Sequence, residues 1–262
     1  LGNDTTICED SLIIFDALAG SAWSWSNGDS TKSTTVNTSG DYSVVVSDGL
    51  GCKGYDTISL GLQSLPIVNL GNDTTICSDS IIIFDSGIGL EWNWSNGADT
   101  KTTTVNTIGD YSVVVSDELG CTSYDTISLD IQSLPIVNLG NDTTICADSI
   151  IIFDAGIGSI WSWSNGAATK TTTVNISGDY SVVVSDGLGC TGYDTISLDI
   201  QSLPIVLLGK DTVICEFDDL ILNASNPNLN HIWSTGENSQ TIVVDKEGLY
   251  SVEVIDSKGC LG

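Results

Sequence analysis

Apolar and polar residues alternate along most of this chain, whereas the spacing typical of an amphipathic helix is absent. Tyr42, Val44 and Val46 illustrate the alternation, because they fall on one face of an extended segment while their neighbours fall on the other. Turn residues such as Asn27-Gly28 separate the alternating runs. In the first part of the chain we expect strands over residues 4–8, 12–16, 23–26, 34–37, 42–47 and 55–60. The pattern predicts an all-β protein.

Two kinds of aromatic position indicate the type of β-fold. A further short strand after Asn27-Gly28 is expected to bring the number of strands to about seven, as in an immunoglobulin-like sandwich. Trp25 lies on the third strand, where such sandwiches carry a core tryptophan, and Tyr42 follows a Gly-x turn, as a tyrosine corner does. Trp23 falls on the same face as Trp25. Such a pair could stack on sugars, but we favour packing in the core.

The whole pattern occurs four times, with a period of 69 residues between the first cysteines. The motif LGNDTTIC begins at Leu1, Leu70 and Leu139, and the variant LGKDTVIC begins at Leu208. Each copy has about the size of a minimal sandwich domain. We therefore expect a tandem array of four immunoglobulin-like domains. They cover residues 1–64, 65–133, 134–202 and 203–262, and the last is truncated and divergent.

The segments between copies contain no flexible spacer. The chain runs through YDTISLDIQSLPIVNLGNDTT with no Gly/Ser tract, and a Leu-Pro pair such as Leu65-Pro66 stands at each junction. Short, stiff joints predict an elongated rod. Because the chain starts inside one motif and ends before the fourth copy reaches its YDTISL counterpart, we expect a segment of a longer protein.

Each copy carries two cysteines, and no CxxC motif or Cys/His cluster is present. This usage favours disulfides and an oxidising compartment. In an immunoglobulin-like sandwich the two cysteines of one copy lie at opposite poles, too far apart to bond, so we favour bridges between neighbouring copies. The expected pairs are Cys8–Cys121, Cys77–Cys190 and Cys146–Cys260, which leaves Cys52 and Cys215 for units outside this chain. The alternative is Cys8–Cys52 and its equivalents.

The chain carries 34 acidic residues against 7 basic ones, a formal net charge of −27. Such a charge excludes a nucleic-acid-binding protein, which needs cations on the phosphates. No apolar run has the length of a membrane span, so we expect no membrane insertion in this segment. No catalytic motif is present, and a single histidine excludes a His-based site in every copy. We expect no enzymatic activity.

The expected topology gathers four aspartates near one pole of each domain. Converging carboxylates beside a joint would suit Ca²⁺, which takes six to eight oxygen ligands. The candidate ligands are Asp4, Asp16, Asp48 and Asp56, then Asp73, Asp85, Asp117 and Asp125, and then Asp142, Asp154, Asp186 and Asp194. The alternative is that these aspartates bond to nearby backbone groups in turns.

The combination of LGNDTTIC, WSWSNG, GDYSVVVSD and YDTISL resembles the PKD-like and immunoglobulin-like repeats of secreted Bacteroidota surface proteins. These include gliding-motility adhesins exported by the type IX secretion system. The likeness covers all four copies, although WSNG departs from the WDFGDG of standard PKD domains. It implies an extracellular location on a bacterial cell surface and a mechanical role, but no ligand.

A recurring Asp-Ser or Asp-Thr dipeptide followed by an apolar residue or Thr resembles the O-glycosylation signal of Bacteroidota exported proteins. The candidate acceptors are Thr5, Ser11, Thr57, Thr74, Ser80, Thr126, Thr143, Ser149 and Thr195. The alternative is that threonine is frequent here because it favours strands.

These features favour a structural function, namely the stalk or filament segment of a long surface adhesin used in gliding or attachment. Its expected partners are further copies of the same repeat. The alternative is an array that binds surface glycans or another protein weakly at each copy and gains avidity by repetition. A third possibility is lateral association of chains. A binding array should present the same exposed cluster on every copy, and the aromatic residues favour the spacer because they fall at core positions.

Overall fold

The computed structural model describes residues 1–216 and 218–262, which form strands and connecting loops with no helix in that part of the chain. The chain divides into two compact units, Leu1–Gln132 and Ser133–Gly262. The first unit contains the first and second copies of the sequence pattern, here called repeats one and two. The second unit contains repeats three and four. We describe each unit by itself.

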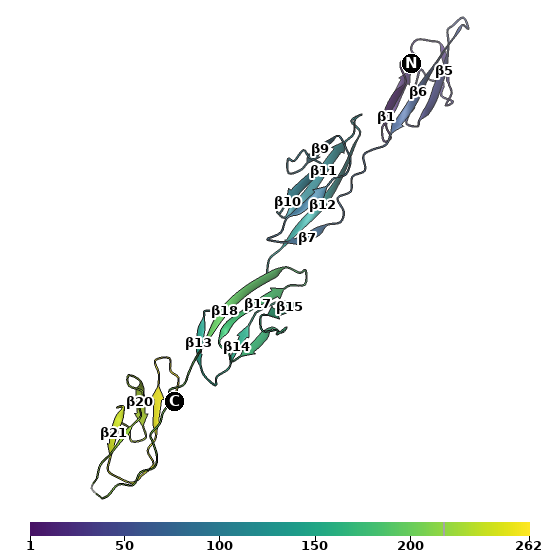
Figure 1. Ribbon diagram of the computed structural model, residues 1–262. Coiled ribbons are helices and arrows are strands. Elements are labelled where there is room, and N and C mark those ends of the chain that lie inside the picture. The colour runs from purple at the N-terminus through teal and green to yellow at the C-terminus, as the bar shows by residue number, and fades with distance from the viewer. Residues whose placement is uncertain (217) are drawn as a thin grey trace. The chain divides into compact units, whose positions relative to one another are not determined.

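Repeat one forms a four-stranded sheet and a two-stranded sheet that enclose one apolar core (Figure 1). Its strands are β1 Thr5–Cys8, β2 Ile13–Asp16, β3 Ala22–Trp25, β4 Ser33–Val36, β5 Gly40–Ser47 and β6 Lys53–Gln63. The larger sheet has the order β1-β6-β5-β3, and the smaller one pairs β2 with β4. In the larger sheet β1 runs parallel to β6, whereas the other neighbouring strands are antiparallel. This arrangement confirms the expected all-β, immunoglobulin-like fold class.

Repeats two and three have the same architecture, each around its own apolar core. The strands of repeat two are β7 Thr74–Cys77, β8 Ile82–Asp85, β9 Glu91–Trp94, β10 Thr102–Val105, β11 Gly109–Ser116 and β12 Thr122–Gln132. Those of repeat three are β13 Thr143–Cys146, β14 Ile151–Asp154, β15 Ile160–Trp163, β16 Thr171–Val174, β17 Gly178–Ser185 and β18 Thr191–Gln201. In both, the first strand again runs parallel to the last.

Repeat four contains four short strands in its described residues: β19 Leu220–Asn223, β20 Asn230–Trp233, β21 Thr241–Val244 and β22 Val252–Ile255. They form two antiparallel pairs, β19 with β21 and β20 with β22. A smaller core of buried residues lies between them, with Trp233 and Val254 among its members.

The expected tryptophan and tyrosine positions have the roles that their spacing indicates. Trp94 is buried, and its indole N–H donates to the Thr100 carbonyl oxygen at 2.8 Å. The Tyr111 hydroxyl donates to the carbonyl oxygen of Thr107, four residues upstream, at 2.8 Å. The corresponding bonds recur in the other three repeats. Each tyrosine hydroxyl thereby fixes the turn that lies just upstream of the tyrosine, as in a tyrosine corner.

The expected seventh strand is wrong for the described residues. After β3 the chain turns instead, because polar side chains satisfy the backbone locally. The Asp29 N–H donates to Asn27 Oδ1 at 3.1 Å, and the Thr31 N–H donates to Asp29 Oδ1 at 3.1 Å. The Gly28 N–H donates to the Trp25 carbonyl oxygen at 3.0 Å. Because these turn bonds use the backbone groups that a further strand would need, each complete repeat has six strands.

Candidate functional site at the joints between repeats

The segment between repeats one and two lies against both of its neighbours within the first unit. The Leu65 N–H donates to Glu9 Oε1 of repeat one at 3.3 Å. Further on, the Leu70 N–H donates to Asp125 Oδ2 of repeat two at 2.8 Å. Val68 and Leu70 pack against the core of repeat two. The segment therefore belongs structurally to the sandwich that follows it and is not a free linker.

Gly87 shows how closely this segment approaches repeat two. It has a φ of +85°, and a Cβ at this position would lie 2.9 Å from the Ile67 carbonyl oxygen. That separation is too short for an ordinary contact, and the left-handed backbone conformation also favours glycine. The backbone of the joint thus lies directly on the loop between β8 and β9.

A disulfide bridge crosses the same joint. Cys8 is the last residue of β1 in repeat one, and Cys121 directly precedes β12 in repeat two. The two residues form a disulfide with a Cα–Cα separation of 5.6 Å, within the usual range for such bridges. Cys121 is 1% exposed. The bridge closes a loop across 113 residues, and in the chain-entropy model a loop of about 100 residues stabilises the folded state by about 4.7 kcal/mol.

The second unit contains the corresponding bridge between repeats three and four. Cys146, at the end of β13, is bonded to Cys260, with a Cα–Cα separation of 5.4 Å and a sequence separation of 114. The preceding segment again lies close, since a Cβ at Gly262 would lie 2.1 Å from the Pro204 carbonyl oxygen. The two joints are therefore built alike.

The parallel pairing of β1 with β6 explains why the bridges join different repeats. Cys8 stands opposite Gln63 at the end of β6, whereas Cys52 directly precedes Lys53 at its start. At ~3.3 Å per residue, the two ends of this strand are ~33 Å apart. The alternative pairing of Cys8 with Cys52 is therefore excluded.

The remaining cysteines fall into two classes. Cys77 and Cys190 are both disulfide-bonded, and their pairing with each other stays a prediction. Cys52 and Cys215 are exposed free thiols. Each occupies a position whose counterpart in another repeat is bonded, since Cys52 corresponds to Cys121 and Cys215 corresponds to Cys8.

An aspartate in the hairpin between β11 and β12 holds the bridged cysteine in place. Asp117 Oδ1 accepts hydrogen bonds from the N–H groups of Leu119 at 3.0 Å and Cys121 at 2.9 Å. Its Oδ2 is buried and has no hydrogen-bond partner in the described part of the chain. Asp186 Oδ1 accepts the same pair of bonds before Cys190 in repeat three. Sequence reasoning placed these carboxylates near the joint and left open whether they bind a metal ion or nearby backbone groups.

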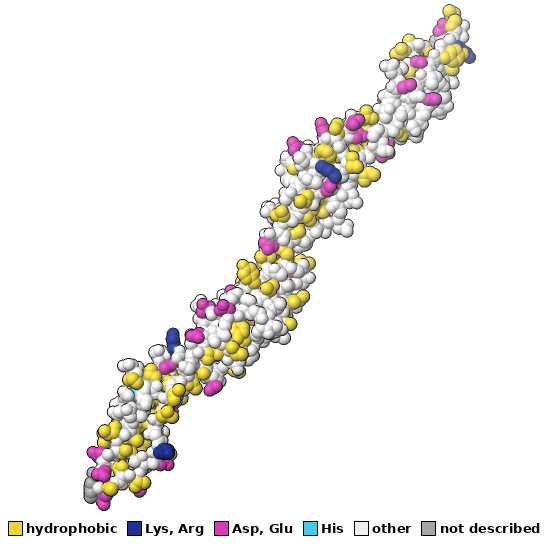
Figure 2. All heavy atoms as spheres, viewed as in Figure 1, with side chains coloured by type: hydrophobic (Ala, Val, Ile, Leu, Met, Phe, Trp, Pro, Cys, Tyr) yellow, Lys and Arg dark blue, Asp and Glu magenta, His cyan; other side chains and the backbone are white. Residues whose placement is uncertain are grey.

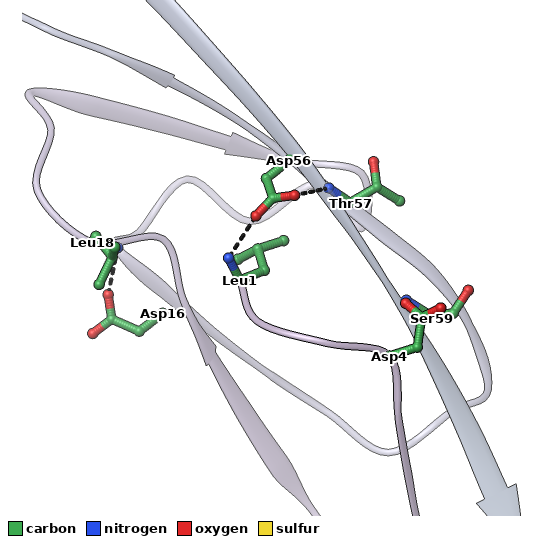
Figure 3. Close-up of polar contacts among 7 residues, drawn as sticks. All are labelled: Leu1, Asp4, Asp16, Leu18, Asp56, Thr57 and Ser59. Carbon is green, nitrogen blue, oxygen red and sulfur yellow. Dashed lines mark hydrogen bonds and ion pairs between the residues drawn. The ribbon is translucent and has the colours of Figure 1, made fainter.

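The expected convergence of aspartates on a calcium ion is wrong. Figure 3 shows that Asp4, Asp16 and Asp56 each face a separate group of repeat one. Asp56 accepts from the Leu1 amino group at 2.6 Å, and Asp4 Oδ1 accepts from the Ser59 N–H at 2.9 Å. No group of three or more acidic, His or Cys side chains in residues 1–216 and 218–262 is arranged to hold a metal ion.

The aspartates satisfy backbone groups in turns and between strands, so their carboxylates are held apart. The correction applies to Asp4, Asp16, Asp48 and Asp56, and to their counterparts Asp73, Asp85, Asp117, Asp125, Asp142, Asp154, Asp186 and Asp194.

One aspartate in each of the first three repeats also forms an exposed ion pair. In repeat two the Gly87 N–H, and then the Lys101 ammonium at 3.0 Å, hold the pKa of Asp85 below its ordinary value of 3.8. Asp16 with Lys32 and Asp154 with Lys170 are equivalent pairs. Because a lowered pKa favours the charged form, this stabilisation is present above pH 3.8 and is lost as the pH falls through the folded-state pKa of Asp85.

We expect Lys101→Ala to raise the pKa of Asp85 while leaving it below 3.8, because the Gly87 N–H still donates to the carboxylate. Titration of the Asp85 carboxyl carbon by NMR measures this change. Lys170→Ala is the matched control and should leave the Asp85 titration unchanged. An unchanged Asp85 midpoint in Lys101→Ala would show that the ion pair does not act on this group.

In each tryptophan pair one residue is buried and the other is half-buried against the same core, as Trp94 and Trp92 are in repeat two. The indole nitrogens of Trp23, Trp92 and Trp161 are buried and have no hydrogen-bond partner in the described part of the chain. In repeat four the equivalent residue, His231, is 4% exposed, and its Nε2 lies 3.1 Å from the Ser225 carbonyl oxygen. The residues of each tryptophan pair thus pack against the same core, as expected.

A different aromatic residue is exposed on each of the first three repeats, which corrects the expectation that the aromatics occupy core positions. Tyr55, Tyr124 and Tyr193 are 73%, 78% and 82% exposed. Each stands beside a valine of the neighbouring strand, as Tyr124 does beside Val114. Figure 2 shows acidic side chains spread among the apolar ones.

The candidate glycosylation residues differ in exposure. Thr57, Thr126, Thr195 and Ser149 are exposed, whereas the others are half-buried beside strand edges or turns. The half-buried residues are Thr5, Ser11, Thr74, Ser80 and Thr143. Modification of any of them stays a prediction.

In the part of the chain that is described, no helix is long and apolar enough to span a membrane.

The chain matches no protein-family model and no curated protein. Its fold is similar to that of several solved tandem immunoglobulin domains. The N-terminal eight domains of Down Syndrome Cell Adhesion Molecule align over 96% of this chain and 51% of that one, with 14% identity and a TM-score of 0.36. An I-band fragment from titin aligns over 73% of this chain and 89% of that one, with 14% identity and a TM-score of 0.35.

The insect immune protein hemolin aligns over 98% of this chain and 95% of that one, with 13% identity and a TM-score of 0.31. The chain spans about half the length of the adhesion-molecule structure. The fold assignment itself rests on the strands, cores and tyrosine corners described above.

Proposed function

We propose that this chain is a structural segment of an extracellular adhesin, in which covalently bridged sandwich domains separate a functional part from its anchor. The observation that carries this proposal is the disulfide that crosses a joint, Cys8–Cys121 in the first unit and Cys146–Cys260 in the second. Such a bridge adds nothing to a catalytic or ligand site. It does prevent two neighbouring domains from separating.

Disulfides of this kind support an extracellular location, since they persist in oxidising compartments. The resemblance of the repeats to those of Bacteroidota surface proteins supports a bacterial cell surface, and gliding or attachment as the process served. The net charge of −27 supports a solvated chain that stays separate from its neighbours. No enzymatic activity belongs to this proposal.

The partners that we propose are further repeats of the same kind. Cys52 is a free, exposed thiol at the position where repeat two carries the bridged Cys121. A groove of about 490 Å³ adjoins it, lined in part by Leu18, Gly20 and Tyr55. Repeat two has its preceding joint segment packed against the equivalent face, so repeat one has the features needed to accept such a segment.

One observation favours a second function, a binding array with surface glycans or another protein as its partner. The exposed Tyr55, Tyr124 and Tyr193 recur on three repeats with the same neighbours. Identical weak sites at a fixed spacing would bind with avidity. The same face would also serve lateral association of chains.

Replacement of the repeats distinguishes the two functions. In cells that carry the adhesin, we exchange this segment for the same number of unrelated immunoglobulin-like domains. A spacer keeps surface attachment at its original level after the exchange, whereas a binding array loses it. The matched variant Tyr55→Ser/Tyr124→Ser/Tyr193→Ser should leave attachment unchanged. Loss of attachment in this triple variant, with the fold intact by circular dichroism, would overturn the spacer proposal in favour of binding.

A further inference from the structure

Each of the first three repeats carries an Asn-Gly pair in the turn that follows its third strand. The pairs are Asn27-Gly28, Asn96-Gly97 and Asn165-Gly166. In such a pair deamidation of the asparagine is chemically easiest, because glycine has no side chain to hinder attack by its own backbone nitrogen. The spacer function uses none of these residues.

Deamidation begins at the glycine nitrogen. Once deprotonated, this nitrogen attacks the asparagine Cγ atom, a succinimide ring forms, and ammonia leaves. Water then opens the ring at one of its two carbonyl groups, which gives either aspartate or isoaspartate. Water is the only co-reactant, and the asparagine and glycine of all three pairs are exposed. Exclusion of solvent therefore does not protect these sites.

The fold holds the glycine nitrogen in a hydrogen bond. The Gly97 N–H donates to the Trp94 carbonyl oxygen at 2.9 Å, and Gly28 and Gly166 form the equivalent bonds at 3.0 Å. An amide proton held in this way is protected from removal until the bond opens, as in hydrogen exchange. The first step of deamidation is thus blocked while the turn is closed.

The asparagine carboxamide is held at both ends. Asn96 Nδ2 donates to Thr103 Oγ1 at 2.8 Å, and Asn96 Oδ1 accepts from the Ala98 N–H at 3.2 Å. Thr103 is 6% exposed and lies on β10, so the first bond ties the turn to the smaller sheet. The same two bonds recur in repeats one and three. Rotation of the carboxamide toward the glycine nitrogen would break both.

Repeat four has the same turn without the reactive residue. The Gly236 N–H donates to the Trp233 carbonyl oxygen at 2.9 Å, but Thr235 stands in the place of the asparagine. Gly236 has a φ of +96°, which favours glycine. The turn therefore requires the glycine but not the asparagine.

We propose that Asn27, Asn96 and Asn165 are sites of spontaneous deamidation, which the fold keeps unreactive and which react when their own repeat unfolds. Isoaspartate adds one carbon atom to the backbone path, so the turn can no longer form with the same hydrogen bonds. The chain thereby keeps a covalent mark on each repeat that has been open. The proposal does not rest on the spacer function, because heat or denaturant opens a repeat as load does.

Incubation of the whole chain near neutral pH tests the proposal. One sample is native, and the other is reduced and unfolded in guanidinium chloride. Mass spectrometry of proteolytic peptides measures conversion at each asparagine. We expect conversion of Asn96 to be at least about tenfold faster in the unfolded sample, since the native turn must first open.

Asn93 is the internal reference for this experiment. It lies in the same repeat and precedes Trp94, whose bulk hinders attack, so it should convert far more slowly than Asn96 in the unfolded sample. Equal rates at Asn96 in the native and unfolded samples, or no conversion of Asn96 in the unfolded sample, would overturn the proposal.

Thr103→Val tests the hydrogen bond to the carboxamide in the folded chain. Valine has nearly the shape of threonine but offers Asn96 Nδ2 no acceptor. Conversion of Asn96 should rise about two- to tenfold, the factor equivalent to one net hydrogen bond, while Asn165 is unaffected. The matched control Thr172→Val should accelerate Asn165 alone. Hydrogen exchange in β9 and β11 verifies that repeat two stays folded, and an unchanged Asn96 rate in folded Thr103→Val would contradict the proposed protection.

Discussion

Under load, the oxidised chain is expected to reach an end-to-end distance of only about 130 Å, against about 900 Å after reduction, at ~3.4 Å per residue. The reason is the position of the two bridges. With Cys8–Cys121 and Cys146–Cys260 intact, the shortest covalent path between the termini contains only residues 1–8, 121–146 and 260–262. Unfolding of any repeat then releases almost no length. Single-molecule force spectroscopy with and without a reductant measures both limits.

Removal of one bridge in the same experiment tests the predicted Cys77–Cys190 pair. In Cys8→Ser/Cys121→Ser the shortest covalent path would follow residues 1–77, cross Cys77–Cys190, return along residues 146–190 and cross Cys146–Cys260. The maximum end-to-end distance should therefore rise by about 300 Å. If Cys77 and Cys190 are not bonded to each other, the path follows residues 1–146 and the limit should rise by about 380 Å. An oxidised wild-type chain that extends as far as the reduced one would contradict the bridged joints and the spacer proposal together.

Trp94→Ala is expected to destabilise repeat two by about 3–5 kcal/mol, a large part of the about 5–15 kcal/mol typical of a whole domain. Trp94 is 2% exposed and lies opposite Val113 in the sheet, so truncation leaves a cavity in the core. It also removes the hydrogen bond to the Thr100 carbonyl oxygen. Hydrogen exchange followed by mass spectrometry measures the loss for repeat two separately from the other repeats.

Trp92→Phe is the matched control, because the Trp92 indole N–H is buried without a hydrogen-bond partner in the described part of the chain. Replacing this group loses no hydrogen bond, so the change in stability should stay within about 1.5 kcal/mol. Exchange in repeat three should be unaffected by either substitution. If the two variants destabilise repeat two equally, the two indoles do not differ as their contacts indicate.

The strands and the core positions were predictable from the sequence because both depend on local pattern. Alternation of period two marks which side chains face inward, and turn residues mark where each strand ends. Trp94 and Tyr111 therefore have the roles that their spacing predicts. Repetition of the pattern likewise predicts separate cores, and each of the four repeats has one.

The positions of the aspartates were not predictable in the same way. A carboxylate near a joint can bind a cation or a backbone N–H, and only the fold determines which groups are within reach. Asp117, for example, is turned toward the N–H groups of its own hairpin. The same limit applied to Tyr124, whose place on the outward face of β12 depends on the pairing of that strand.

The sequence by itself thus determined the fold class, the repetition and the inward-facing residues, because these follow from contacts between near neighbours in the chain. The tertiary structure decided what depends on distant segments. It placed β1 parallel to β6, so that Cys8 lies at the far end of a long strand from Cys52 and beside the next repeat.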